Sequence, residues 1–302
     1  MHHITVAICT WNRCGLLRQC LEQITKVAIP PEIEWELLVV NNNSTDATDE
    51  VIASFSDRLP VRRLFEPKPG KSHALNLAAQ EARGEYILWT DDDVLVDNDW
   101  IVGYCEAFKR HPAAAFFGGP IEPLFARTPP PWLQRAWRYI AGAYALRDFD
   151  KQPFRLDDQS LPFGANLAIR AGEQAKYFYD TNLGPRPHSA LRGEEETLLK
   201  TMLAEGHEGW WVPNARVRHY IPVERMRVQY IRRFFFGQGE YLAKTEPAWN
   251  GATLFGKPRW LWRYALSCEA KYLIGRLISP PEKWIQNLIK ASIAWGRLRR
   301  LT

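Results

Sequence analysis

Three consecutive carboxylates, Asp91, Asp92 and Asp93, come directly after an apolar run of strand-forming residues at positions 86–90. Such a run predicts a buried strand, which places the acids at its C-terminal end. In open α/β sheets that edge is where ligands bind. Adjacent acids repel one another unless a cation is present, and hard divalent cations prefer oxygen ligands. The stretch therefore predicts a cation site, with a solvated acidic turn as the simpler alternative.

Strand patterns and helical patterns alternate through the first part of the chain. This order predicts an α/β fold with a Rossmann-like, mostly parallel sheet that is flanked by helices on both faces. Ser72 is expected to cap the third helix, and Gly84 is expected to end it. The strand patterns cover residues 4–10, 36–40, 61–65 and 86–91, and the helical patterns cover 16–24, 51–55 and 74–82.

Polar turns follow three of the predicted strands, at residues 10–13, 41–46 and 91–93. Because the carboxyl ends of parallel strands meet at one edge of a sheet, these turns should lie together. The Gly-x-Gly-x-x-Gly loop of dinucleotide-binding proteins is absent, and so is a P-loop, which counts against a dehydrogenase or an NTPase. The pattern predicts a ligand-binding edge without identifying the ligand.

Composition sets broad limits on the function. A chain of 302 residues suits two domains, or one large α/β domain with an appendage. The net charge of +5, from 39 basic and 34 acidic residues, does not indicate nucleic-acid binding. Thirteen tryptophans indicate sugar stacking, contact with a membrane interface, or an aromatic-rich core.

Five cysteines form an odd set whose spacing matches no zinc motif. We interpret them as reduced packing residues, which predicts a cytoplasmic protein. The strand that begins at Ile4 leaves no room for a signal peptide, and no apolar run approaches the roughly 18 residues of a membrane span.

Six segments, in order along the chain, form a pattern that covers about residues 4–240. They are residues 6–13 (VAICTWNR), 38–46 (LVVNNNSTD), 84–94 (GEYILWTDDDV), 161–170 (LPFGANLAIR), 193–195 (GEE) and 213–219 (PNARVRH). Together they resemble the motifs of the family 2 glycosyltransferases, which have a GT-A fold. The resemblance implies a nucleotide-sugar-binding half at residues 1–120, an acceptor-binding and catalytic half at 121–255, and a basic amphipathic helical tail at 256–302.

The resemblance also implies a reaction. Such an enzyme would move one sugar, with inversion, from a UDP-, GDP- or dTDP-linked donor to the hydroxyl of a glycan or a lipid-linked glycan. The sequence departs from the family at Asn41, where Asp is usual and often contacts the base, and at Glu195, where Asp is the more frequent general base. The Gln-x-x-Arg-Trp motif of processive synthases is absent, so we expect a single transfer and no polymerisation.

The family's metal and nucleotide roles transfer to individual positions. Asp93 is the expected ligand of Mn²⁺ or Mg²⁺, and Asp91 would contact the ribose or reach the metal through water. His219 would complete the coordination of the metal or touch the diphosphate. The alternatives are a surface position for the aspartates and Lys71, an ion pair for Arg13, packing for Trp11 and a structural role for His219. The expected nucleotide contacts are Thr10, Trp11, Arg13, Asn41, Asn43, Lys71, Asp91 and Asp92.

Glu195 is the expected catalytic base, because a carboxylate can take the proton from an attacking hydroxyl. Glu194 and Glu196 remain rivals, although consecutive helical residues point about 100° apart and only one can face the acceptor. The simpler alternative is an acidic first turn that stabilises a helix N-terminus. Gly164 and Asn166 are expected to shape the acceptor pocket.

From residue 258 onward, Trp, Leu, Ile, Lys and Arg alternate at helical spacing, and Pro280-Pro281 separates two helices. This pattern suits helices that lie in a membrane interface, where anionic lipids attract Lys and Arg. The protein would then be peripheral on the cytoplasmic face of a membrane. The alternative is packing against the catalytic domain or against a second copy in a homo-oligomer.

Two other classes of function remain open at this point. A non-catalytic sugar- or membrane-binding protein could retain the same fold. A nucleotidyltransferase also uses acids at strand ends, but it usually has a Gly-rich loop with a Lys after the first strand. Here that turn is Trp11-Asn12-Arg13.

Overall fold

The computed structural model describes residues 2–185, 193–245 and 249–300. The chain packs as two units, which we call the sheet unit (residues 2–124, 145–184 and 194–220) and the helical unit (residues 125–144 and 221–300). These units are defined by packing. The division by role at residues 120 and 255 stays a prediction.

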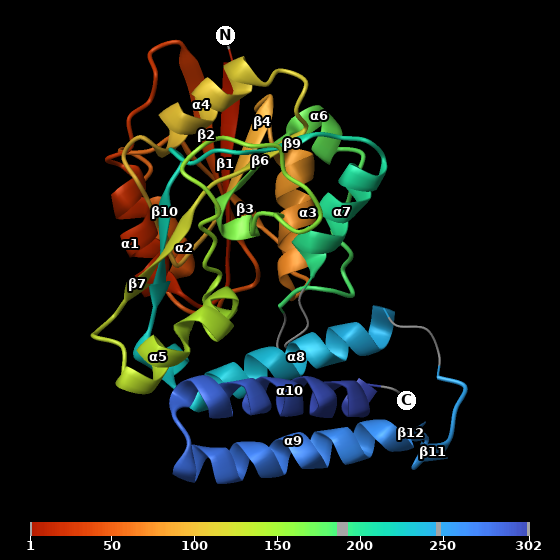
Figure 1. Ribbon diagram of the computed structural model, residues 1–302. Helices are drawn as coiled ribbons and strands as arrows, with labels where there is room; N and C mark the ends of the chain where they lie inside the picture. Colours follow the sequence, from red (N-terminus) through yellow and green to blue (C-terminus); the bar gives the residue numbers. More distant parts are fainter. Residues whose placement is uncertain (1, 186–192, 246–248, 301–302) are drawn as a thin grey trace. The chain divides into compact units, whose positions relative to one another are not determined.

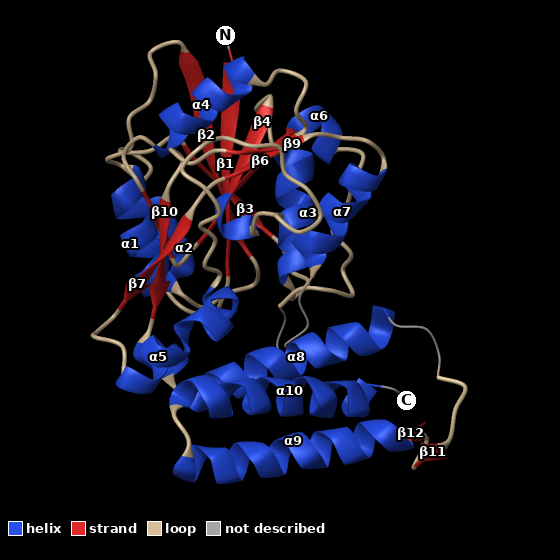
Figure 2. Ribbon diagram, viewed as in Figure 1, coloured by secondary structure: helices blue, strands red, loops and turns tan. Residues whose placement is uncertain are grey.

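The sheet unit is built on a seven-stranded sheet with the order β3-β2-β1-β4-β8-β6-β9. Figure 2 shows strands of this unit in red with helices around them in blue. Every neighbouring pair is parallel except the two pairs made by β8, which runs antiparallel to β4 and β6. The predicted mostly parallel α/β sheet is therefore confirmed. The strands are β1 (His2–Thr10), β2 (Ile33–Asn41), β3 (Val61–Phe65), β4 (Tyr86–Asp91), β6 (Phe116–Gly118), β8 (Leu167–Arg170) and β9 (Gly209–Trp211).

Helices cover both faces of this sheet, and the pleat of the strands explains how. Successive side chains of a strand point to opposite faces. Val6 and Ile8 accordingly join the core under α1, α2 and α4, whereas Ala7 between them joins the core under α3 and α7. The helices are α1 (Cys14–Ile24), α2 (Thr48–Ala53), α3 (Lys71–Glu81), α4 (Trp100–Arg110), α6 (Ala171–Gln174) and α7 (Glu194–Ala204).

The register of the central strands brings the predicted polar turns together. Thr10 at the end of β1 is paired with Asn41 at the end of β2, and Cys9 is paired with Asp91 at the end of β4. β1 lies between β2 and β4, so the strand order reverses beside it. In open α/β sheets such a reversal leaves a ligand-binding crevice at the carboxyl ends of the strands.

Two expected helix boundaries are wrong. α3 already begins at Lys71, and the hydroxyl of Ser72 donates to the carbonyl of Leu183 instead of capping the helix. Gly84 lies beyond the end of α3, where a Cβ would come within 2.4 Å of the backbone nitrogen of Thr5. Gly84 is therefore required by the close approach of two backbones, not by a left-handed helix end.

A second sheet, with the order β5-β10-β7, carries His219. Its strands are β5 (Val94–Val96), β7 (Ile121–Phe125) and β10 (Val217–Ile221). β10 continues two residues past His219, so this histidine lies within the strand. His219 is paired with Val94, the residue that follows the three aspartates.

The helical unit is built around α10, which packs against both α8 and α9. Glycines allow the α8–α10 approach: a Cβ at Gly239 or at Gly296 would lie within 2.1 Å of a backbone oxygen of the other helix. The two predicted tail helices are confirmed: the first ends at Ile278, and the second begins at Pro281. The elements are α5 (Pro131–Ile140), the 3-10 turns Ala141–Tyr144 and Val223–Met226, α8 (Val228–Thr245), the pair β11 (Thr253–Leu254) and β12 (Lys257–Pro258), α9 (Arg259–Ile278) and α10 (Pro281–Arg300).

Within the described part of the chain, no helix combines the length and the apolar character that crossing a bilayer requires.

Candidate active site

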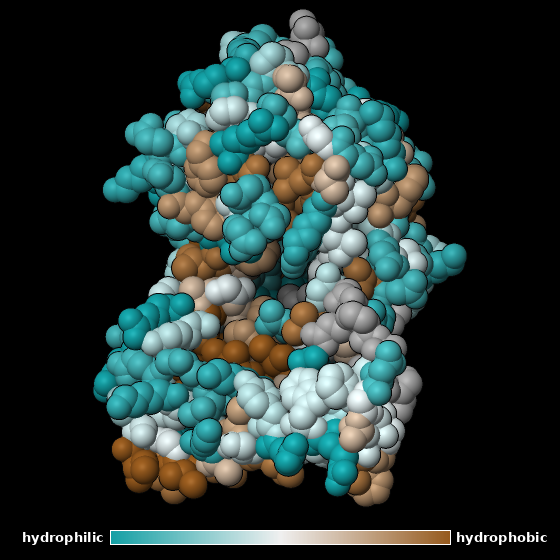
Figure 3. All heavy atoms as spheres, turned by 45° about the vertical axis from the view of Figure 1, so that its right-hand side comes forward, coloured by the Kyte–Doolittle hydropathy of each residue, from teal (hydrophilic) through white to brown (hydrophobic). Residues whose placement is uncertain are grey.

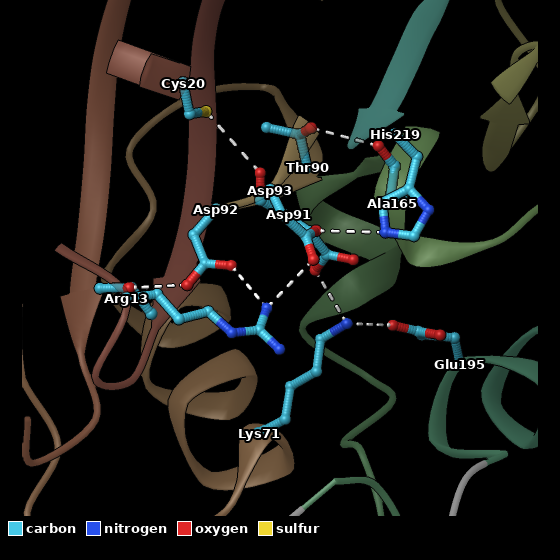
Figure 4. A network of polar contacts seen from close by, with 11 residues as sticks. Arg13, Cys20, Lys71, Thr90, Asp91, Asp92, Asp93, Ala165, Glu195 and His219 are labelled. Atoms are coloured by element: carbon cyan, nitrogen blue, oxygen red, sulfur yellow. Dashed lines mark hydrogen bonds and ion pairs between the residues drawn. The ribbon is translucent and has the colours of Figure 1, made fainter. Parts of the chain in front are cut away.

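The three aspartates at the end of β4 belong to one network of polar contacts (Figure 4). The hydroxyl of Thr10 donates to Asp92 Oδ2 at 2.8 Å. The guanidinium of Arg13 donates to Asp92 Oδ1 at 2.9 Å and to Asp93 Oδ2 at 3.2 Å. The side chains of Asp92 and Asp93 are almost fully buried, whereas that of Arg13 is 42% exposed. The turn after β1 thus holds two of the aspartates in place from the solvent side.

Asp93 also faces His219, with 3.4 Å between Asp93 Oδ1 and His219 Nε2. The antiparallel pairing of β10 with β5 explains this contact, because it places His219 opposite Val94. The backbone N–H of Tyr220 donates to the carbonyl of Asp93 at 2.8 Å, which fixes the two segments further. A carboxylate and an imidazole from distant parts of the sequence therefore meet in a buried place.

Lys71 connects the aspartates to the acidic start of α7. Its ammonium lies 2.9 Å from Asp91 Oδ1 and 3.0 Å from Glu195 Oε1. Burial would lower the pKa of Lys71, but the carboxylates of Asp91, Glu195 and Glu194 outweigh it and raise that pKa well above its ordinary value. Lys71 is thus a permanent cation that bridges two carboxylates.

The first turn of α7 separates the three candidate bases. Glu195 points to Lys71 and the aspartates, and its side chain is 17% exposed. Glu194 is buried beside Gly184. Glu196 faces solvent and pairs with Lys200 one helical turn further on, at 2.6 Å. Consecutive helical positions diverge by about 100°, and Glu195 is the position whose carboxylate contacts Lys71 beside Asp91.

Gly164 lies directly against Glu195. It begins a short 3-10 turn, Gly164–Asn166, and a Cβ built on it would lie 2.1 Å from Glu195 Oε1. The missing side chain therefore makes room for the carboxylate. Gly164 thus lies beside the candidate base, and its part in an acceptor pocket stays a prediction.

Asn166 is fully buried, and its side chain connects several segments of the sheet unit. Its Oδ1 accepts hydrogen bonds from Trp100 Nε1 and from the hydroxyl of Tyr104, both at 2.8 Å. Its Nδ2 donates to the carbonyls of Pro120 and Ala215 at 2.9 and 2.7 Å. Asn166 thus holds its own segment against three others, and its part in shaping an acceptor pocket stays a prediction.

We expect Asn166→Ala to lower the free energy of unfolding by about 3 kcal/mol or more, because several buried polar groups would lose their partners. Urea unfolding followed by tryptophan fluorescence measures this change. The same substitution at the exposed Asn250 is the control, with an expected change within about 0.5 kcal/mol. Equal stability of the two variants would contradict a structural role for Asn166.

The remaining candidates for nucleotide contact divide into exposed and engaged side chains. Trp11 is 44% exposed, and Asn43 is exposed with a left-handed backbone (φ 59°). Asn41 is buried, and its amide is used twice: it donates to Asp49 at 2.7 Å and accepts from the backbone of Ser44 at 2.8 Å. These hydrogen bonds shape the turn after β2, and the contact of Asn41 with a base stays a prediction.

Two asparagines that we did not single out organise the edge of the sheet. Asn42 donates to the carbonyls of Glu66 and Lys68 and accepts from the N–H of Gly70, which holds the loop before Lys71. Asn12, in a left-handed conformation (φ 52°), accepts from the backbone of Thr45 and so ties the turns after β1 and β2 together. The sequence signal for both was their place in the polar turns after the first two predicted strands, and at Asn12 an asparagine also tolerates the left-handed backbone.

Negative charge accumulates at the site. Five carboxylates, from Asp91 to Asp93 and from Glu194 and Glu195, interact with two permanent cations, Arg13 and Lys71. Burial raises the pKa of Asp92 to about 6, Arg13 opposes this shift, and the neighbouring Asp93 adds to it. A bound cation would relieve this excess of negative charge.

The residues present fit a divalent metal at Asp93 and His219. Two adjacent ligands of an octahedral metal at about 2.1 Å are about 3 Å apart, close to the observed 3.4 Å. In residues 2–185, 193–245 and 249–300, no three His, Cys, Asp or Glu side chains form a group that could hold a metal. One or two protein ligands completed by substrate phosphates and water are a common arrangement for such ions.

Comparison with protein families gives one match over more than half of the chain. The model described as "Glycosyl transferase family 2" matches residues 5–167, which contain β1 to β4, the three aspartates and the Gly164–Asn166 turn.

Curated relatives are named for the synthesis of glycans. The succinoglycan biosynthesis protein ExoM of Rhizobium meliloti (strain 1021) is 24% identical over 283 residues, which are 88% of this chain and 85% of ExoM. The poly-beta-1,6-N-acetyl-D-glucosamine synthase of Staphylococcus epidermidis is 28% identical over 119 residues, which are 39% of this chain but only 28% of the synthase. The matching segment thus corresponds to about a quarter of the length of the synthase.

Solved structures share the fold. The mannosyltransferase PcManGT from Pyrobaculum calidifontis, in complex with GDP-Man and Mn²⁺, superposes with a TM-score of 0.65 at 16% identity, covering 99% of this chain and 86% of PcManGT. Residues 1–349 of TarS from S. aureus give a TM-score of 0.55 at 14% identity, covering 98% of this chain and 91% of that one. The expected GT-A architecture is confirmed.

Proposed function

Because the chain belongs to glycosyl transferase family 2, we propose that it moves one sugar from a nucleoside-diphosphate sugar to an acceptor hydroxyl, with inversion and with the help of a divalent metal. The observation that supports this proposal is the set of contacts on the three consecutive aspartates: His219 meets Asp93, and Lys71 connects Asp91 to Glu195. The chain is a glycosyltransferase, so a non-catalytic protein and a nucleotidyltransferase are set aside.

In the proposed reaction Glu195 is the general base. The acceptor oxygen attacks the anomeric carbon, its proton passes to the Glu195 carboxylate, and the bond from that carbon to the diphosphate breaks with its electron pair on the phosphate oxygen. Attack on the side opposite the leaving group inverts the configuration. Lys71 holds Glu195 at 3.0 Å and orients it, and Gly164 leaves room for its carboxylate.

Asp93 and His219 are the proposed metal ligands, and Asp91 is placed to meet the ribose or a metal-bound water. Mn²⁺ or Mg²⁺ at this place would offset the charge that builds up on the departing diphosphate. The imidazole favours Mn²⁺, because Mg²⁺ prefers oxygen ligands. Arg13, which contacts Asp92 and Asp93 at the exposed side, is placed to meet a phosphate group.

The donor and acceptor are proposed by class. PcManGT holds GDP-Man with Mn²⁺, and TarS holds UDP or UDP-GlcNAc, so we propose a UDP-, GDP- or dTDP-linked sugar for this chain. The names of ExoM and the poly-N-acetylglucosamine synthase support a glycan or lipid-linked glycan as the acceptor. We propose a single transfer on the cytoplasmic side of a membrane, consistent with five free cysteines.

A thermal-shift panel of UDP, GDP, dTDP and their sugars, each with and without Mn²⁺, tests the proposal. A ligand at a hundred times its Kd stabilises the folded state by about 2.7 kcal/mol, which shifts the melting temperature by several degrees. We expect one nucleotide class to stabilise the protein, and only when Mn²⁺ is present. Stabilisation that is equal with EDTA would contradict metal dependence, and the absence of stabilisation by any diphosphate would contradict the donor class.

A further inference from the structure

Exposed hydrophobic side chains are concentrated in one short part of the chain. Fourteen large hydrophobic residues are exposed among the described residues, and ten of them lie within residues 249–278. Figure 3 shows strongly hydrophobic colour gathered at the lower left, and Figure 1 shows the C-terminal end of α9 at the lower left. A contiguous apolar surface on a folded protein usually marks an interaction site. The four others, Trp11, Phe65, Phe149 and Phe178, are dispersed through the sheet unit.

α9 is apolar on two opposite faces. Its inner face, formed by Leu261, Ala265, Cys268 and Tyr272, is buried, and α9 packs against α10. Its outer face is exposed and also apolar, with Leu277 and Ile278 at 86% and 78% exposure. The inner face holds α9 against α10. Because the outer face packs against nothing in the described chain, the packing of the bundle does not explain why that face is apolar. The outer aliphatic residues are Leu266, Ala270, Leu273, Ile274, Leu277 and Ile278.

The hairpin before α9 presents another apolar side chain. β11 and β12 are joined by a two-residue turn, Phe255-Gly256, in which both residues have positive φ (51° and 71°). Glycine accepts this conformation readily, but an aromatic residue does so at a cost in conformational energy. Phe255 nevertheless occupies the tip of the hairpin and is 84% exposed.

The charge on this surface has one sign. Arg259, Arg263 and Lys271 are exposed on α9, and none of them pairs with a carboxylate among the described residues. The one acid of the helix, Glu269, is engaged by Arg232 of α8 in a bidentate pair at 2.7 and 2.9 Å. The two arginines lie in the first part of the helix near Trp260, whereas the second part is mainly aliphatic. Cations and aromatics beside an aliphatic surface are typical of helices in a membrane interface.

We propose that the outer face of α9, with the tip of the hairpin at Phe255, binds the surface of a bilayer that contains anionic lipids. The aliphatic second half of α9 would lie among the acyl chains, and Arg259 and Arg263 would reach lipid phosphates. α10 does not take part, because it is enclosed between α8 and α9. The inference rests on the proposed function in one respect: a lipid-linked acceptor would be presented by the same membrane that α9 binds.

A second copy of the chain fits this face less well than a bilayer does. A two-fold contact places the same residues on both sides of the interface. Both sides would then carry Arg259, Arg263 and Lys271, with no free acid on either face to compensate their charge. An anionic lipid surface supplies the opposite charge.

Vesicle co-flotation of the full-length protein tests the proposal, with vesicles of phosphatidylcholine alone or mixed with phosphatidylglycerol. We expect binding that is stronger with phosphatidylglycerol. The double substitution Leu277→Glu/Ile278→Glu should weaken it by about tenfold, because two inserted side chains become charged. The matched control, Phe65→Glu/Phe178→Glu, adds the same charge at exposed positions outside α9 and should bind as the wild type does. Melting temperatures check that all variants are folded.

Charge is tested separately. Arg263→Gln should reduce binding to phosphatidylglycerol vesicles by about fivefold and leave binding to phosphatidylcholine unchanged.

Equal flotation of the wild type and the Leu277/Ile278 variant would overturn the proposal. So would a wild-type dimer that ignores vesicles and becomes a monomer in that variant. Donor binding with Mn²⁺ is measured in the same samples without vesicles, so a failure of the membrane surface and a failure of the proposed reaction can be told apart.

Discussion

Asp93→Asn should lower kcat/KM for sugar transfer by about a thousandfold, which corresponds to about 4 kcal/mol of lost transition-state stabilisation. The amide has nearly the shape of the carboxylate but no charge, so it is a poor ligand for a hard cation. Asp93 is buried, and its carboxylate lies 3.4 Å from His219 and 3.2 Å from Arg13. The substitution should therefore remove metal-dependent donor binding while the fold is kept. Release of the nucleoside diphosphate from the donor measures the effect.

The control for this variant is Asp57→Asn, which makes the same change at an exposed position of the sheet unit. It should transfer sugar at the wild-type rate. His219→Gln should share the loss of Mn²⁺ dependence with Asp93→Asn, because both side chains are proposed ligands of one ion. If Asp93→Asn keeps Mn²⁺-dependent binding of the nucleoside diphosphate, the metal assignment is wrong.

Glu195→Gln should lower kcat by about 10²- to 10⁴-fold, the usual contribution of a general base. Binding of the donor should change little, because the amide oxygen can still accept a hydrogen bond from Lys71. Glu196→Gln is the matched control, since Glu196 is the neighbouring residue on the solvent side, paired with Lys200. It should retain nearly full activity. Single-turnover transfer at saturating donor separates the chemical step from binding.

The opposite ranking of these two variants would mean that the base is not Glu195. Glu194→Gln gives a third, independent result. Glu194 is buried, so this variant should lose stability as well as activity. A loss of activity in Glu194→Gln with unchanged melting temperature, together with an active Glu195→Gln, would transfer the role of base to Glu194.

The sheet and its ligand edge could be predicted from the sequence because they depend on local patterns. The apolar runs at residues 4–10, 36–40 and 86–91 correspond to β1, β2 and β4, and the parallel register aligns their ends. Three of the six resembling segments, at residues 6–13, 38–46 and 84–94, cover the ends of these strands and the turns after them. Helix boundaries were less certain: Ser72, for example, has the residue type of a cap but bonds to Leu183 instead.

The pairing of side chains within the site could not be predicted, because it depends on distant segments. Lys71 and Glu195 are 124 positions apart in the sequence, and no local pattern indicates that the lysine faces a carboxylate and not a phosphate. Asn166 stands in a segment that resembles an acceptor site, yet four hydrogen bonds from three other segments place it in the core. Which of three consecutive glutamates turns inward likewise depends on where α7 begins.

For the two tail helices, too, contacts with distant segments could not be predicted from the sequence. Its amphipathic pattern predicted two helices, and both are present. The pattern did not predict which one would be enclosed, because α9 and α10 have similar compositions. The packing of α10 between α8 and α9 leaves α9 with the exposed apolar surface.

Anomalous diffraction at the manganese edge, from crystals grown with Mn²⁺ and the nucleoside diphosphate identified in the thermal-shift panel, tests the central claim most directly. The account predicts one strong peak within about 2.3 Å of both Asp93 Oδ1 and His219 Nε2, with the diphosphate oxygens among its other ligands. A bound diphosphate that is held by Arg13 and Lys71 with no manganese beside Asp93 would contradict it.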